Sequence, residues 1–158
     1  MHPTHARTIA IGLPMGLAVV GAIATGDGLK TWYPTLKKSK LVIPLWAFTP
    51  AAIGYSVLCG RLLSRLLRME RTTPDRTAAL LLLGSMMGAN EGWNYLFLGR
   101  HSMRAGFFGM IGYTLLTIRL YRLLRRCDPP AARMLRPYVG WLGYDLVYTF
   151  ELWRLNRD

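Results

Sequence analysis

The sequence predicts an all-α integral membrane protein in which five transmembrane helices form one bundle. The chain has 158 residues and is 52% hydrophobic, yet its formal net charge is +12. The charges are concentrated between long apolar runs. Each run has roughly the 20 residues that an α-helix needs to cross about 30 Å of hydrocarbon. A helix satisfies its own backbone hydrogen bonds, so a helical bundle is the fold expected in lipid.

The length corresponds to about one domain, so residues 1–158 are expected to form a single membrane domain. Arg61 and Arg119 enter two spans near a helix end, where long side chains can extend to the surface. The first span resembles a secretory signal that ends at Ala22-Ile23-Ala24, but we interpret it as a retained membrane helix. The spans are expected at about residues 8–26, 43–64, 77–99, 104–124 and 133–154.

The distribution of basic residues predicts an orientation. With five spans, the N-terminus and the second and fourth connections share one side, which holds the larger share of the 20 Lys and Arg residues. The positive-inside rule then places the N-terminus in the cytoplasm or matrix. These basic clusters are expected to attract anionic lipid headgroups, and solvated loop ends that only fix topology are an equal alternative. Nucleic-acid binding is not expected, because it needs a basic soluble face.

The sequence contains little that indicates catalysis or a cofactor. Cys59 and Cys127 are isolated and form no CxxC pair, which argues against a metal or dithiol site and leaves a structural disulfide open. The histidines, His2, His5 and His101, are expected to be surface residues. No Ser/His/Asp set or phosphate-binding loop is visible in the sequence, so we expect neither an enzyme nor a required cofactor.

The last span carries a polar and aromatic stripe. Tyr138, Trp141, Asp145 and Tyr148 are spaced i, i+3, i+7 and i+10, so they share one helix face. A carboxyl group in a bilayer costs several kcal/mol unless it faces protein, water or a ligand. The stripe therefore predicts an internal surface, which we interpret as a pocket. The opposite face is expected to contact lipid and contains Leu142, Leu146, Phe150 and Trp153.

A lid-like loop is expected at residues 27–42, after the first span. It contains Trp32 and Tyr33, and such residues favour the headgroup region. We expect the loop to lie over the mouth of the bundle, with an interfacial anchor that touches no ligand as an equal alternative. Trp46 and Phe48 follow at the start of the second span, where Pro50 is expected to bend the helix.

The third span carries two features. Gly84, Gly88 and Gly92 form small-xxx-small repeats, which favour close helix pairing either within the bundle or in a homodimer. A second face is assigned to the pocket, with a helix–helix hydrogen bond as the alternative for Asn90, while Glu91 is expected to point elsewhere. This face contains Asn90, Trp93, Asn94 and Phe97.

Four motifs occur in order along the chain. The first loop has Trp32, Tyr33, Leu36 and Lys38, and the second span opens with Ile43, Pro44, Trp46, Phe48 and Pro50. The third span has Asn90, Trp93, Phe97, Leu98 and Gly99, and the fifth has Pro137, Tyr138, Trp141, Trp153, Arg154 and Asn156. From about residue 29 to 156, the chain resembles the TspO/MBR family, the tryptophan-rich sensory proteins and translocator protein (peripheral benzodiazepine receptor).

The resemblance implies a five-helix bundle, often dimeric, with a pocket beneath the first loop. Such pockets bind porphyrins, haem, sterols or benzodiazepine-type drugs, and flat apolar molecules of this kind stack well on aromatic rings. A short sterol-associated motif is matched by Leu146, Tyr148 and Arg154. The positions that correspond to the pocket are Trp32, Tyr33, Trp46, Phe48, Asn90, Trp93, Tyr138, Trp141 and Asp145.

The sequence departs from the family pattern at several positions. Ala52 stands where a tryptophan linked to light-dependent porphyrin breakdown is expected, which argues against that activity here. Ala105 replaces an aromatic residue, Ser39 a proline, and Thr149 an asparagine. Asp145 replaces a small residue, so it either adds a polar contact for a ligand or marks a pocket that has lost its former ligand.

Two functions follow as hypotheses. The first is a multi-pass membrane protein that binds a tetrapyrrole, haem or a sterol-like lipid and acts as a sensor, carrier or scavenger. The second is a structural accessory subunit of a larger membrane complex. A homodimer in a bacterial inner membrane is expected, and a mitochondrial membrane stays open. Inverted repeats with paired broken helices are not visible, so a strict transporter is not indicated.

Overall fold

The structure is a computed structural model that describes residues 3–41 and 45–156. Within these ranges all regular secondary structure is helical, without strands, which confirms the predicted all-α class. A short helix, α2 (Gly28–Thr31), and 3₁₀ turns at Tyr33–Thr35 and Leu45–Ala47 connect the first two long helices. The long helices are α1 (Pro3–Thr25), α3 (Phe48–Arg68), α4 (Arg76–Asn94), α5 (Met103–Cys127) and α6 (Pro129–Leu155).

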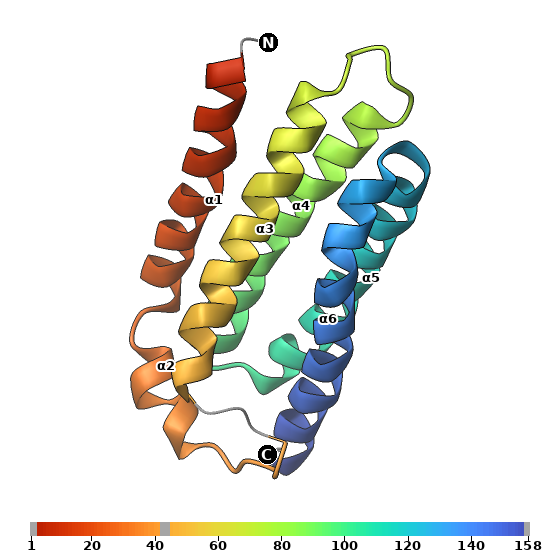
Figure 1. Ribbon diagram of the computed structural model, residues 1–158. Coiled ribbons are helices and arrows are strands. Elements are labelled where there is room, and N and C mark those ends of the chain that lie inside the picture. Colours follow the sequence, from red (N-terminus) through yellow and green to blue (C-terminus); the bar gives the residue numbers. More distant parts are fainter. Residues whose placement is uncertain (1–2, 42–44, 157–158) are drawn as a thin grey trace.

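The long helices run alongside one another as an elongated bundle (Figure 1). Helix α1 lies at one edge and packs on α3 and α4, while α5 packs on α4 and α6. The described chain begins at one end of the bundle and finishes at the other. The segment between α1 and α3 crosses the bundle at the end where α6 terminates (Figure 1). We call this the loop end, because residues 27–41 lie there.

The helix bounds differ from the predicted spans at the second helix. Helix α3 extends from Phe48 to Arg68, whereas the predicted span ends at residue 64. The hydrophobic run ends there, but arginine is a good helix former, so the helix continues past it. Pro50 lies in the first turn of α3, where the backbone N–H has no helical partner, so the helix accommodates proline there. The predicted start at residue 43 lies outside the described residues.

Side-chain caps define two of the helix starts. The Ser102 hydroxyl accepts a hydrogen bond from the Ala105 backbone N–H at 3.2 Å, which begins α5. Asp128 accepts from the Ala131 N–H at 3.3 Å, which begins α6. Pro129 occupies the first turn of α6, where proline is favoured. The turn between α5 and α6 is therefore short and fixed by sequence-local chemistry.

The face of α6 that was expected to contact lipid is partly internal. Leu142 is 0% exposed and belongs to the main core, and Leu146 packs against the same core. Trp153 stacks on Phe107 of α5 with ring centroids 5.2 Å apart, while Phe150 remains 38% exposed. The prediction for Leu142 was wrong, because this residue belongs to the main core of the bundle. Periodicity identifies a shared face but does not say which neighbouring helix covers it.

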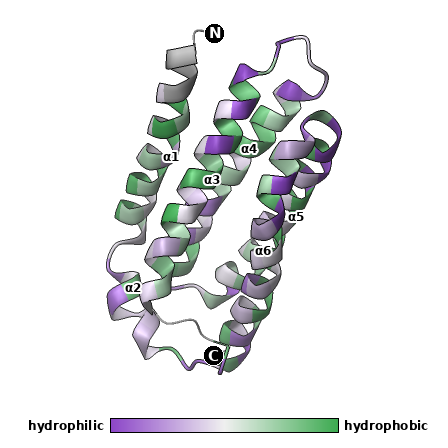
Figure 2. Cartoon of the chain, viewed as in Figure 1, coloured by the Kyte–Doolittle hydropathy of each residue, from purple (hydrophilic) through white to green (hydrophobic). Residues whose placement is uncertain are grey.

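Two of the described helices are long and apolar enough to cross a membrane. These are residues Thr8–Thr25 of α1, with a mean hydropathy of 1.9, and α5, with a mean hydropathy of 1.2. Hydrophobic residues extend along α1, whereas hydrophilic residues gather at the α3–α4 connection (Figure 2). Ile11, Met15 and Ile23 of α1 are all more than half exposed. An apolar outer surface of this kind is typical of a helix that contacts lipid.

Candidate functional site at the loop end

The loop of residues 27–41 is held against α6. Tyr33 is 3% exposed, and its hydroxyl is hydrogen-bonded to the Tyr148 hydroxyl. The Tyr144 hydroxyl donates to the carbonyl oxygen of Leu41. Residues Lys37 and Asn156 exchange two hydrogen bonds of 2.9 and 3.0 Å. These contacts join segments more than a hundred residues apart, so the loop closes one end of the bundle.

Trp32 fixes the loop to the end of the third long helix. Its ring stacks on His101 at a centroid distance of 4.8 Å and meets the edge of Phe97 at 5.7 Å. His101 has a φ of 56°, a backbone conformation that is uncommon outside glycine. Phe97 belongs to a π-helical turn at Tyr95–Gly99 that follows α4. The loop therefore rests on a locally irregular part of the bundle.

Trp93 of α4 contacts α5 rather than an open cavity. Its Nε1–H donates to the Gly106 carbonyl oxygen at 2.7 Å, and its ring stacks on Phe97 at 5.0 Å. A Cβ atom added at Gly109 would lie 3.1 Å from the Trp93 ring, so glycine permits this close approach. Trp93 and Phe97 together fill the space between α4 and α5.

The polar residues of α4 form one cluster beside α1. The Asn90 side chain donates to Glu91 Oε1 at 2.9 Å, and Asn94 donates to Glu91 Oε2 at 3.5 Å. The Glu91 carboxylate lies against Gly21 of α1, where a Cβ atom would collide with it. Asn90 and Asn94 therefore both donate to the Glu91 carboxylate, which lies at the interface between α4 and α1.

The stripe on α6 lies inside the bundle. Tyr138 hydrogen-bonds to Tyr113 at 2.7 Å and packs on Tyr55 at 5.3 Å. Trp141 packs against the main core and also interacts with the half-buried Asp145. Tyr148 is buried beneath the loop.

The aromatic residues beneath the loop form a second core, which we call the loop-end cluster. Phe48 of α3 joins it by an edge contact with Tyr33 at 5.7 Å. Burial of the Tyr33 ring also raises the pKa of its phenol. The cluster contains Trp32, Tyr33, Phe48, Trp93, Phe97, Tyr144 and Tyr148.

Trp46 and the glycine repeats of α4 lie apart from the loop-end cluster. Trp46 is 74% exposed and stands apart from the loop-end cluster. Among the described residues, none lies within 4 Å of a Cβ atom built at Gly84, Gly88 or Gly92. The glycine repeats therefore face outward, and the alternative of pairing within the bundle was wrong. No helix in the described ranges covers that face of α4.

The sterol-motif residues do not share a surface. Leu146 packs against the main core, and Tyr148 is buried. Arg154 is exposed and forms an ion pair with Glu151 at 2.8 Å.

Of the positions that depart from the family pattern, Ala52 is exposed and Thr149 is buried, with its hydroxyl donating to the Asp145 carbonyl at 2.7 Å.

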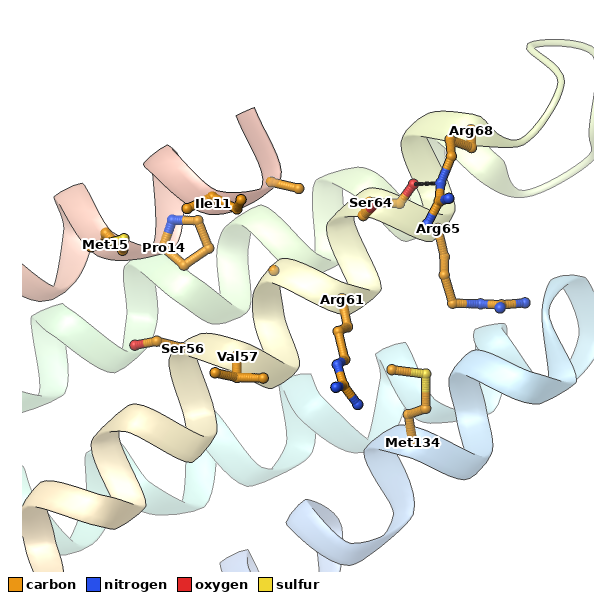
Figure 3. Close-up of a pocket in the computed structure, with 12 residues that line it drawn as sticks. Ile11, Pro14, Met15, Ser56, Val57, Arg61, Ser64, Arg65, Arg68 and Met134 are labelled. Carbon is orange, nitrogen blue, oxygen red and sulfur yellow. Dashed lines mark hydrogen bonds between the residues drawn. The ribbon is translucent and has the colours of Figure 1, made fainter. Parts of the chain in front are cut away.

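Two cavities lie away from the predicted pocket residues. One, of about 470 Å³, is lined by Ser102, Arg104, Ala105 and Phe108. The other, of about 580 Å³, follows the outer face of α3 (Figure 3). Neither is lined by the aromatic residues beneath the loop, because those rings already pack against one another. In the described ranges, no group of three His, Cys, Asp or Glu residues could hold a metal ion.

Several residues of the interior were not singled out from the sequence. Tyr55 and Tyr113 complete the group around Tyr138, and Tyr144 anchors the loop. Each is a phenol within an apolar span, and a buried hydroxyl usually needs a partner, which is the signal that could have found them. Asp128 was also missed, although an Asp immediately before two prolines is a typical helix start.

Comparison with known proteins identifies the group to which this chain belongs. The TspO/MBR family profile matches residues 10–154, almost the whole chain. The chain belongs to the TspO/MBR family. It is 24% identical over 148 residues to the tryptophan-rich protein TspO of Chlorobaculum tepidum, covering 94% of each chain. It is 27% identical over 139 residues to the translocator protein of Ovis aries, covering 84% of this chain and 78% of the relative.

Protein CrtK of Rhodobacter capsulatus is a further TspO/MBR-type relative, 26% identical over 139 residues, with 88% of this chain and 87% of the relative covered. The relatives therefore come from bacteria and from animals. Family membership and the two apolar helices together support a membrane location.

Proposed function

We propose that this chain is a five-span membrane protein that binds a flat hydrophobic ligand beneath the loop of residues 27–41. The ligand class is a tetrapyrrole such as haem, or a sterol-like lipid, and the protein acts as a sensor, carrier or scavenger. The observation that carries the proposal is the burial of Tyr33 against Tyr148 under the loop. Membership of the TspO/MBR family supports it.

Ligand entry requires the loop to move, because the loop-end cluster fills its own interior. Three sets of contacts would open: Tyr33 with Tyr148, Tyr144 with Leu41, and Lys37 with Asn156. All are hydrogen bonds at one end of the bundle, each worth about 1 kcal/mol net. Their loss can be offset when a flat ligand stacks on the released aromatic rings. The loop is thus a reversible lid.

Trp141 and Asp145 determine which ligands the proposed pocket selects. The Trp141 ring offers a stacking surface on α6, and the Asp145 carboxyl lies one turn further along the same face. A carboxyl group in this position selects ligands that carry a hydrogen-bond donor or a cationic group. No catalytic role is assigned to these residues, and no cofactor is required.

The proposed oligomer is a homodimer formed through α4. Gly84, Gly88 and Gly92 are exposed on α4, where a second helix can approach closely. The N-terminus lies on the cytoplasmic or matrix side, by the bias of basic residues. A bacterial inner membrane is favoured, and a mitochondrial membrane is the alternative. Anionic lipid headgroups are expected partners at the basic ends of the helices.

Titration of the detergent-purified protein with protoporphyrin IX tests the ligand proposal. Saturable quenching of tryptophan fluorescence is expected in the unaltered chain. Trp141→Phe should weaken it, and Asp145→Ala should change the affinity for the porphyrin. Trp46→Phe is the matched control, because Trp46 is exposed and outside the loop-end cluster. Equal quenching in all variants, or none that saturates, would contradict the proposed pocket.

A structural accessory subunit is the second candidate function. It is supported by the filled interior at the loop end and by the uncovered glycine face of α4. Asp145, where the family has a small residue, also fits a pocket that has been repurposed. Gentle solubilisation from the native membrane followed by size analysis separates the two functions. A stable complex with other chains would favour the subunit, and a free homodimer would weaken it.

A further inference from the structure

A groove follows the outer face of α3 at the end of the bundle opposite to the loop (Figure 3). Its walls come from α1 on one side and from Met134 of α6 on the other, and its volume is about 580 Å³. We call it the α3 groove. It is lined by Ala10, Ile11, Pro14, Met15, Ser56, Val57, Gly60, Arg61, Ser64, Arg65, Arg68 and Met134.

The lining of the α3 groove changes character along the bundle axis. Gly60 lies opposite Ala10, where a Cβ atom would come within 2.7 Å of the Ala10 carbonyl oxygen. At this level and toward the loop end, the lining is mostly apolar and includes Pro14, Met15 and Val57. The hydroxyl of Ser56, which also lines this part, donates to the Ala52 carbonyl oxygen at 3.0 Å. Beyond the level of Gly60, toward the C-terminus of α3, the lining is cationic. The groove therefore joins a mostly apolar stretch along the outer face of α3, which we call the apolar channel, to a positive end, which we call the rim.

The cations at the rim are only partly compensated. Arg65 is held by Asp128 through two hydrogen bonds of 2.9 and 2.8 Å. Arg68 donates to the Ser64 carbonyl oxygen at 3.1 Å, which leaves its remaining nitrogens for another acceptor. Within the described part of the chain, Arg61 has no hydrogen-bond or ion-pair partner. Its side chain extends toward Met134 inside the groove (Figure 3).

Arg61 stands seven residues before the end of α3, which is about 10 Å along the helix axis. An arginine at this depth is costly unless it reaches the interface or meets an anion. Val57 lies one helical turn deeper on the same face of α3, and its side chain is 51% exposed. The apolar channel therefore begins one turn below Arg61, where the cationic rim ends. This order, anion-binding groups at the surface and apolar side chains below, matches the order of phosphate and acyl chain in a phospholipid.

We propose that the α3 groove binds one anionic phospholipid, with its phosphate on Arg61 and Arg68 and an acyl chain along Met15 and Val57. A sterol or a zwitterionic lipid would leave the rim cations without a matching net charge. A second copy of this chain, with its net charge of +12, would bring further positive charge to the rim. The inference depends on insertion in a membrane, but not on the ligand proposed at the loop end.

Native mass spectrometry of the full-length chain, offered equal amounts of phosphatidylglycerol and phosphatidylcholine in detergent, tests this site. Preferential retention of one phosphatidylglycerol is expected. Arg61→Gln with Arg68→Gln should lower that retention about tenfold. Val57→Trp should lower it without any change of charge, because the indole would occupy the channel. Helix content measured by circular dichroism confirms that each variant is folded.

Arg125→Gln with Arg126→Gln is the matched control, since both residues are exposed and end α5 outside the groove. An equal loss of lipid in this control would show general attraction to basic loops and overturn the proposal. Retention unchanged by Val57→Trp would overturn the acyl-chain placement. Competition by free glycerol phosphate as strong as by the lipid would show a phosphate site only. A dimer mass that Val57→Trp abolishes would assign the groove to a second copy.

Discussion

Arg65 of α3 and Asp128 at the start of α6 form a two-point ion pair, in which both oxygens of the carboxylate accept from the guanidinium. Asp128 is 6% exposed, and Arg65 is 38% exposed. The same carboxylate accepts the Ala131 N–H and so begins α6. One side chain therefore joins α3 to the α5–α6 turn and caps a helix.

This pair predicts a pH dependence of stability. The Arg65 guanidinium lowers the pKa of Asp128 below its usual range. The carboxylate is therefore favoured in the folded state, and its contribution is complete above the unfolded pKa of about 4. That contribution is lost as the pH falls through the lower folded pKa. Thermal unfolding in detergent from pH 7 to 3 should show the loss, and Asp128→Asn should flatten it.

Asp128→Asn should cost about 1–2 kcal/mol at neutral pH, because it removes a charge-assisted bond but keeps a capping oxygen. Glu151→Gln is the control, since its pair with Arg154 is exposed and should contribute little. A pH profile of Asp128→Asn that overlays the unaltered protein would contradict this account.

Gly106→Ala should destabilise the bundle. A Cβ atom at this position would collide with the Phe97 ring, and the same residue accepts the Trp93 hydrogen bond. Overpacking of this kind costs about 1–3 kcal/mol. Gly112→Ala is the control on the same helix, because no described residue lies within 4 Å of its Cβ atom. If both variants unfold at the same temperature, the packing described for Phe97 is wrong.

The loop should open when the hydrogen bond between Tyr33 and Tyr148 is removed. Tyr33→Phe and Tyr148→Phe should each lower the free energy of loop opening by about 1 kcal/mol. Proteolytic cleavage within residues 27–41 should therefore become faster in each variant. The double variant should cleave no faster than either single variant, because both remove the same bond. Strictly additive effects would show that the two hydroxyls act independently.

Gly88→Leu should separate the proposed dimer without unfolding the monomer. No described residue contacts a Cβ atom at Gly88, so the bundle can accept leucine there. A second helix packed on this face cannot accept leucine there, because the close approach of the two backbones requires small residues. Light scattering in detergent should change from dimer to monomer, with unchanged helix content. Gly12→Leu, on the exposed face of α1, is the control and should leave the mass unaltered.

The sequence by itself determined the helices and the family. Apolar runs predicted the all-α class that the described residues show, because length and hydrophobicity are local properties. Spacing also predicted that the face with Tyr138, Trp141, Asp145 and Tyr148 is internal. The motifs around Trp32, Trp93 and Trp141 were sufficient to indicate the TspO/MBR family, which the profile match confirms.

Tertiary structure alone decided which surfaces meet. Leu142 is buried in the main core, and Trp93 donates a hydrogen bond to α5, where Gly106 and Gly109 allow a close approach. Neither contact can be predicted from the sequence of one helix, because packing depends on the shape of the neighbouring helix. The Arg65–Asp128 pair joins residues 63 positions apart. The α3 groove likewise exists only because α1 and α6 stand on either side of one helix face, which no local pattern specifies.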